Sequence, residues 1–113
     1  MSRFTGVELT ESRNWWLNRL DQVIEKLAEL GKAKARSEKL YRMALSKELL
    51  DMMEIRSGAI KTEIAKGKPD IAKLRETRDI DVVLYNTCQQ TIYQSKIELN
   101  VVETDYSFER RGN

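Results

Sequence analysis

The fold is decided by residues 71–106, which read IAKLRETRDIDVVLYNTCQQTIYQSKIELNVVETDY. Two sets of residues recur along this stretch at the seven-residue spacing of a coiled-coil helix. Those that repeat every seven residues are Tyr85, Ile92, Leu99 and Tyr106, and those that lie three residues along or in register with them are Ile71, Leu74, Cys88, Ser95 and Val102. Such a repeat is typical of a coiled-coil seam, where one side of a long helix packs against another helix. The stretch therefore predicts one long helix, over about residues 69–110.

This helix is expected to begin at Pro69. Gly67 and Lys68 precede the proline and break the chain. Proline is favoured at the first helical position because its fixed φ angle suits a helix and no hydrogen bond to its nitrogen is needed there.

A second long helix is expected over residues 10–57, ahead of a short link at residues 58–69. Thr10 or Ser12 is the expected N-cap, and Ser57-Gly58 is the expected end. Residues 1–9 would form an N-terminal arm. Apolar residues recur in the first part of this helix at spacings of three and four, namely Trp16, Leu20, Val23, Leu27 and Leu30.

Two long helices with a short connection lie antiparallel. The sequence therefore predicts an all-α fold, a long antiparallel helical hairpin. Its composition agrees, since 113 residues include only one proline and five glycines, with 41% hydrophobic and 34% charged residues. This is the balance of a regular helical chain and not of a disordered one, and the length corresponds to one domain.

The segment Val82–Ser95, VVLYNTCQQTIYQS, carries no charge on any side of the helix. One partner helix covers only one side, so a second copy of the hairpin is expected to cover the rest and complete a four-helix bundle as a homodimer. The alternative is a solvated polar face, because glutamine tolerates exposure. The residues expected to take part in self-association are Tyr85, Cys88, Gln89, Ile92, Ser95 and Leu99.

Charge is unevenly distributed although the net charge is only +2. Residues 32–47 hold six Lys and Arg residues against one acid, whereas residues 79–109 hold six acids against one lysine. An antiparallel hairpin would bring these regions together, so the first interpretation is internal charge pairing. The alternative is that Lys32, Arg36 and Lys39, which share one side of the helix, contact nucleic-acid phosphates. Basic residues that would join them are Lys66, Lys68, Arg75 and Arg78.

Trp15 and Trp16 are adjacent, so on a helix their side chains point about 100° apart. Trp16 continues the apolar spacing of Leu20 and Val23 and is expected in the core. Trp15 is then the better candidate for an anchor that binds a partner protein, because tryptophan is enriched at such positions.

The sequence contains few residues in arrangements that could support catalysis. The chain has no histidine, which is the commonest acid–base group and zinc ligand. Its carboxylates lie in no apolar run that would raise a pKa, and Cys88 has no flanking base to lower the pKa of its thiol. We therefore expect no enzymatic activity, no catalytic residue, no metal site and no cofactor.

A single cysteine cannot form an internal disulfide, and Met1–Leu9 lacks the apolar run of a signal peptide. No stretch reaches the roughly 18 apolar residues that would span a bilayer. These observations predict a cytoplasmic protein without a membrane segment.

The segment that runs from IAKGKPDIAKLRETRDIDVVLYNT, residues 64–87, to the terminal ERRGN resembles the C-terminal half of small uncharacterised helical proteins encoded by prophages of Gram-positive bacteria. The matching features are Gly67, the acidic and basic run Asp70–Asp79, Tyr85 and the basic end. The resemblance implies an early phage product that modulates a host or phage factor, and it implies no site residue.

The expected function is therefore that of a non-enzymatic protein–protein interaction module. A nucleic-acid-binding accessory of replication or recombination and a structural or assembly protein are the alternatives.

Overall fold

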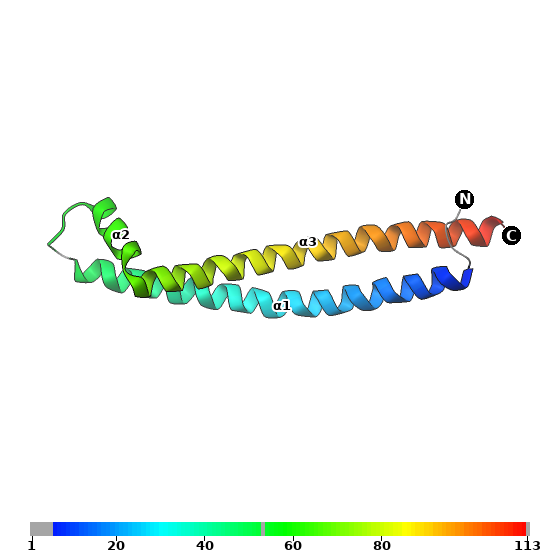
Figure 1. The fold of residues 1–113 in the computed structure, drawn as a ribbon, viewed down its shortest axis with the longest axis horizontal. Helices are drawn as coiled ribbons and strands as arrows, with labels where there is room; N and C mark the ends of the chain where they lie inside the picture. The colour runs from blue at the N-terminus through cyan, green and yellow to red at the C-terminus, as the bar shows by residue number, and fades with distance from the viewer. Residues whose placement is uncertain (1–5, 53, 113) are drawn as a thin grey trace. The chain divides into compact units, whose positions relative to one another are not determined.

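The computed structural model describes residues 6–52 and 54–112, with the side chains of residues 7–52 and 54–108. Three helices follow one another along the chain, α1 over Gly6–Asp51, α2 over Gly58–Gly67 and α3 over Pro69–Gly112 (Figure 1). The described residues contain no strand. The predicted all-α helical hairpin, in which α1 packs against α3, is confirmed.

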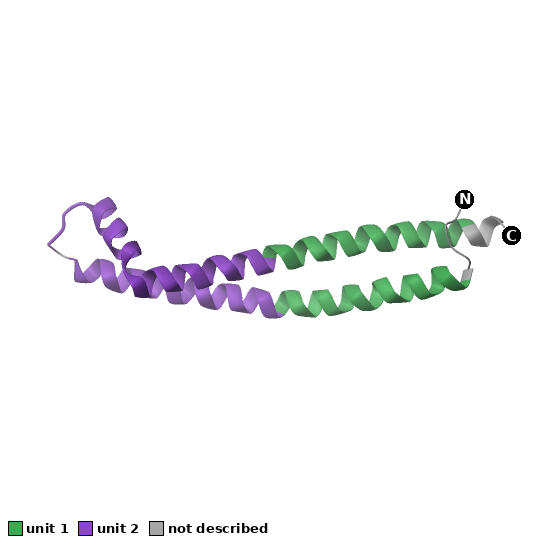
Figure 2. Ribbon diagram, in the orientation of Figure 1, with its two compact units in different colours: residues 1–28, 86–113 green, residues 29–85 purple. Residues whose placement is uncertain are grey.

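The chain forms two compact units (Figure 2). Unit 1 combines residues 1–28 with residues 86–113, and unit 2 consists of residues 29–85. Within each unit, part of α1 lies antiparallel to part of α3, and unit 2 also contains α2 (Figure 2).

The seam of unit 1, where α1 meets α3, is mainly apolar. Leu9 on α1 is fully buried, and Val102 on α3 is buried as well. Two small polar side chains of α3 share this seam. The Cys88 thiol donates a hydrogen bond to the Val23 carbonyl oxygen at 3.4 Å, and the Ser95 hydroxyl donates one to the Thr91 carbonyl oxygen at 2.7 Å. Because both groups are hydrogen-bonded, their burial carries little desolvation penalty.

Unit 2 buries Tyr41, Met52, Ala65 and Ile71, and its seam adds contacts between aromatic rings and cations. The Lys34 ammonium of α1 lies 4.5 Å from the centroid of the Tyr85 ring on α3. In the opposite direction, the Arg78 guanidinium of α3 lies 4.4 Å from the centroid of the Tyr41 ring on α1. The aliphatic stems of both cations can pack in the seam while their charged ends reach solvent.

Gly31 allows one of these rings to lie close to α1. A Cβ atom at this position would lie 3.4 Å from Cε2 of Tyr85. The helix continues through Gly31, so the glycine provides room for the ring and does not break α1.

The ends of α1 differ from those expected. The helix begins at Gly6 and not at Thr10, so residues 6–9 of the expected arm are helical, and residues 1–5 lie outside the described part. It ends at Asp51 and not at Ser57, and Ser57 is instead the N-cap of the next helix. The Ser57 hydroxyl oxygen accepts a hydrogen bond from the Ile60 amide at 3.3 Å, which satisfies a free N–H at the start of α2.

The expected link at residues 58–69 is mostly helix α2, and Ala65 of this helix is fully buried. The break after α2 is short. The Lys68 amide donates to the Ala65 carbonyl oxygen at 3.1 Å, and the Lys68 carbonyl oxygen accepts from Ala72 at 2.8 Å. Helix α3 begins at Pro69, as predicted.

Candidate functional site

A groove of about 500 Å³ lies along α3 in unit 2, next to the end of α2. Its apolar floor is formed by Ile80, Val83 and Leu84, whose exposed fractions are 50%, 61% and 46%. Their spacing of three and four residues places them on one side of α3. We call this set the α3 patch. It is a group of large apolar side chains that α1 does not cover.

The rim of the groove carries both signs of charge. Lys66 of α2 and Arg75 of α3 are the cations, and Glu76 and Asp79 of α3 are the anions. An apolar floor inside a charged rim is the usual composition of a protein–protein contact site.

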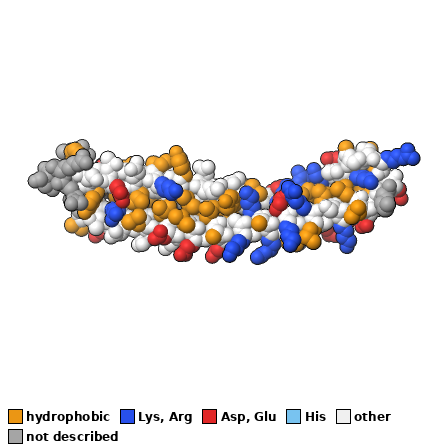
Figure 3. Space-filling view, turned by 180° about the vertical axis from the view of Figure 1, so that it is seen from behind, with side chains coloured by type: hydrophobic (Ala, Val, Ile, Leu, Met, Phe, Trp, Pro, Cys, Tyr) orange, Lys and Arg blue, Asp and Glu red, His pale blue; other side chains and the backbone are white. Residues whose placement is uncertain are grey.

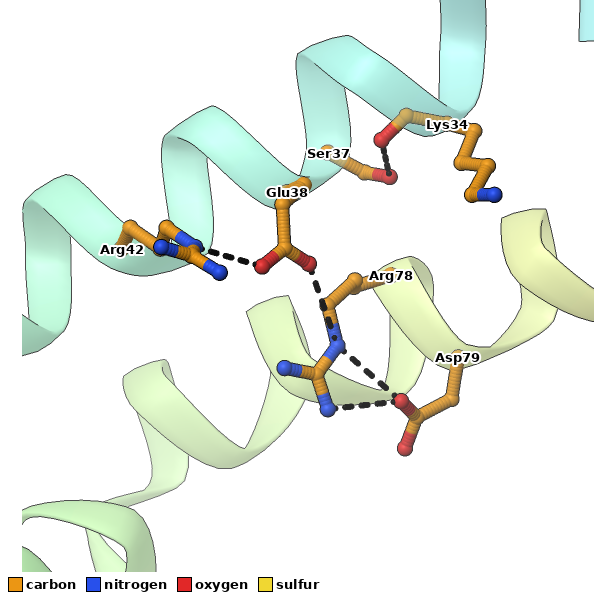
Figure 4. A network of polar contacts seen from close by, with 6 residues as sticks. All are labelled: Lys34, Ser37, Glu38, Arg42, Arg78 and Asp79. Carbon is orange, nitrogen blue, oxygen red and sulfur yellow. Dashed lines mark hydrogen bonds and ion pairs between the residues drawn. The ribbon is translucent and has the colours of Figure 1, made fainter. Parts of the chain in front are cut away.

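A chain of ion pairs crosses from α1 to α3 near this groove (Figure 4). Glu38 of α1 binds Arg42 of the same helix at 2.6 Å and lies 3.6 Å from Nε of Arg78 on α3. Arg78 also donates two hydrogen bonds to Oδ1 of Asp79, at 2.8 Å and 3.1 Å. These hydrogen bonds, and the negative charges of Asp79 and Glu38, raise the pKa of the Arg78 guanidinium.

This network corrects the expected direction of charge pairing. The basic middle of α1 was expected opposite the acids of α3, beginning with Asp79. Instead the acid Glu38 lies on α1 and its basic partner Arg78 lies on α3, while Asp79 binds its own neighbour Arg78.

The predicted nucleic-acid contacts Lys32, Arg36 and Lys39 are all exposed on α1. We call these three residues the basic face. None of the described residues forms an ion pair with them. Lys and Arg side chains gather over unit 2 in Figure 3. Of the further basic residues expected with them, Arg75 lies on the rim of the groove, and Lys68 is paired with Glu48 at 2.5 Å.

Unit 1 presents Trp15 at its surface, with 56% of the residue exposed. Its ring meets that of Trp16 edge to face, with the centroids 4.7 Å apart, and the Arg19 guanidinium lies 5.7 Å from its centroid. Trp16 is half-buried. Trp16 is thus less exposed than Trp15 but does not reach the core, and the role of Trp15 as an anchor stays a prediction.

Outward apolar residues also occur on α3 in unit 1. Tyr93, Ile97 and Val101 follow one another at spacings of four residues, and each is exposed. The spacing places them along one side of the helix, and Figure 3 shows a run of hydrophobic side chains over this unit.

The residues predicted for self-association divide between the seam and the surface. Cys88 and Ser95 are buried, Tyr85, Ile92 and Leu99 are half-buried, and Gln89 is exposed. The seven-residue repeat therefore identified side chains that pack against α1 of the same copy. The α3 patch was missed as a group, although the spacing of Ile80, Val83 and Leu84 outside that repeat was a usable signal.

No helix of the described residues has a stretch apolar enough to cross a membrane. The same residues include no group of three or more His, Cys, Asp or Glu side chains placed to hold a metal ion. No family model, curated protein or solved structure matches this chain.

Proposed function

We propose that this chain is a non-enzymatic protein–protein interaction module that forms a homodimer through the outward side of α3. The observation that carries the proposal is the α3 patch, in which Ile80, Val83 and Leu84 line one groove with about half of each residue exposed. Covering such side chains is favourable by roughly 25 cal/mol for each Å² of apolar surface removed from water.

A second copy of the chain is the occupant that fits the groove best. The rim carries two cations, Lys66 and Arg75, and two anions, Glu76 and Asp79, so its charges sum to zero. In a symmetric dimer the same surface meets itself, and a rim with both signs can then pair cations with anions across the interface. A strongly basic or acidic partner would gain no such match.

The rest of α3 supports the same occupant. Residues 82–95 carry no charge, and unit 1 presents Tyr93, Ile97 and Val101 on the exposed surface of this helix. A stable dimer buries about 1,200 Å² or more in total, so an interface needs more apolar side chains than the α3 patch alone. A four-helix bundle of two hairpins would provide them.

Self-association through α3 leaves Trp15 of α1 available to another protein. We propose Trp15 as the anchor for that partner, because exposed tryptophan contributes strongly to interfaces. The resemblance of the C-terminal half to prophage-encoded helical proteins suggests an early phage product that acts in the cytoplasm on a host or phage factor.

The test is the mass of the protein in solution, measured by size-exclusion chromatography with light scattering. The chain has a mass of 13.2 kDa, and we expect twice this value for the wild type. Val83→Glu should reduce it to the mass of one chain, because a carboxylate in the interface would be buried without a partner.

Ile24→Glu is the matched control. It places the same charge at an exposed isoleucine of α1 and should leave the dimer intact. A wild-type chain that stays monomeric at all concentrations, or a Val83→Glu variant with the wild-type mass, would show that the α3 patch is not the dimer interface.

A further inference from the structure

We propose that the basic face of α1, formed by Lys32, Arg36 and Lys39, binds the phosphate backbone of duplex DNA. This inference is independent of self-association, since these residues lie on α1 and none of them lines the groove of α3.

The first support is that nearby acids are already occupied. Between residues 30 and 50 of α1 the acids are Glu38 and Glu48. Glu38 is held by Arg42 and Arg78, and Glu48 by Lys68. Glu29, three residues before Lys32, also has a partner of its own. None of these carboxylates forms an ion pair with the basic face, so its positive potential is directed to solvent.

The second support is the local excess of positive charge. Unit 2 holds 13 of the 20 Lys and Arg residues but only 10 of the 18 Asp and Glu residues. Much of this excess comes from α1. The reversed pairing across the seam, with the acid on α1 and the base on α3, leaves Lys32, Arg36 and Lys39 facing outward.

The spacing of the three cations suits a nucleic-acid strand. Lys32 and Lys39 are seven residues apart, which corresponds to about 10 Å along a helix axis. One strand of duplex DNA carries a phosphate for each 3.4 Å or so of its axis. The basic face can therefore contact about three phosphates in succession.

The surroundings of the basic face favour duplex DNA over two other anionic ligands, single-stranded nucleic acid and an anionic lipid membrane. Proteins that bind single strands stack the bases on exposed aromatic rings, whereas the rings of unit 2 nearest these cations, Tyr41 and Tyr85, lie in the seam under Arg78 and Lys34. A helix that binds a lipid surface inserts a continuous apolar side. In unit 2 the side of α1 opposite the basic face packs against α3, and the large apolar residues exposed near these cations, Leu40 and Met43, form no such side.

The experiment is fluorescence anisotropy of the full chain with a labelled DNA duplex of about 20 base pairs, two helical turns, starting at about 50 mM salt. We expect binding that weakens with salt, with a slope of log K against log salt near −2.7 for about three phosphate contacts. The triple variant Lys32→Gln, Arg36→Gln, Lys39→Gln should bind at least about tenfold more weakly and lose most of this slope.

The matched control is Lys47→Gln, Lys73→Gln, Lys96→Gln. It removes the same total charge from exposed positions that are spread over both long helices, so it should retain binding within about threefold of the wild type. Circular dichroism establishes that both variants are folded.

Three results would overturn the proposal. The first is no binding to the duplex at low salt, and the second is an equal loss of affinity in both triple variants. The third is tighter binding to the matching single strand, or to vesicles of phosphatidylcholine and phosphatidylglycerol, than to the duplex.

Discussion

Units 1 and 2 use the same two helices but fill the space between them with different chemistry. The seam of unit 1 is closed by apolar residues such as Leu9 and Val102. Unit 2 also buries apolar residues, Met52, Ala65 and Ile71, and in addition its seam places cations against Tyr41 and Tyr85. A cation–π contact at a partly exposed site stabilises by about 0.5–1 kcal/mol, and full burial of a leucine or valine by about 1.5–3 kcal/mol. The cation–π contacts of unit 2 are therefore expected to add less to its stability than its buried apolar side chains.

The largest effect should come from a charge in the apolar seam. Val102→Asp would bury a carboxylate beside α1, which we expect to destabilise the chain by about 4 kcal/mol. Hydrogen exchange followed by mass spectrometry should show faster exchange in residues 86–102, because local opening follows local stability.

The control is the adjacent residue. Val101 is exposed, so Val101→Asp should change the free energy of unfolding by only about 0.5 kcal/mol when both variants are compared on the Val83→Glu background. Equal losses for Val101→Asp and Val102→Asp would contradict the assignment of inner and outer sides of α3 in unit 1.

A smaller effect is expected at the cation–π contacts in the seam of unit 2. Arg78→Met removes the contact with Tyr41 and the ion pair with Glu38, and it should reduce the free energy of unfolding by about 1 kcal/mol. Urea denaturation measures this loss. The raised pKa of Arg78 means that its contribution is complete at lower pH and is lost only in strong alkali, so the loss should be constant from neutral to mildly alkaline pH.

Arg75→Met is the matched control for Arg78. Arg75 is an exposed arginine on the rim of the groove, and its loss should change stability by about 0.5 kcal/mol or less in the monomeric background. An equal effect of the two substitutions would mean that the contacts of Arg78 with the Tyr41 ring and the Glu38 carboxylate add nothing to the stability of unit 2.

The smallest effect sharpens the description of the Tyr85 contact. Gly31→Ala improves helix propensity and places a methyl group in van der Waals contact with the ring, 3.4 Å from Cε2. We expect stabilisation by about 0.5–1 kcal/mol, measured by thermal unfolding. Gly67→Ala is the control, because a Cβ atom there meets nothing within 4 Å. Destabilisation by Gly31→Ala but not by Gly67→Ala would indicate that the Tyr85 ring cannot move to accommodate the added methyl group.

Local signals in the sequence predicted the arrangement of the helices. The seven-residue repeat identified the buried residues Cys88, Ser95 and Val102, and Pro69 marked the start of α3. The end of α1 was placed too late because a serine before a glycine can either end one helix or cap the next. Ser57 does the second, and that choice depends on contacts made by the residues around it.

The candidate surfaces were harder to predict because they depend on how the two helices are rotated. Adjacent residues of a helix point about 100° apart, so whether Arg78 or Asp79 meets α1 decides the sign of the pairing. Position 78 lies seven residues after Ile71 and seven before Tyr85, so the repeat indicates the rotation, but a charged residue was not counted as part of the seam. Once Arg78 faces Glu38, Ile80, Val83 and Leu84 become outward residues. Lys32, Arg36 and Lys39 of α1 are then exposed to solvent.

Coverage of the outward side of α3 by a second copy is tested most directly by the concentration dependence of thermal unfolding. If dimerisation stabilises the fold, the unfolding midpoint of the wild type must rise with protein concentration, while that of Val83→Glu stays constant. A wild-type midpoint that does not change with concentration, and equals that of Val83→Glu, would contradict the dimer.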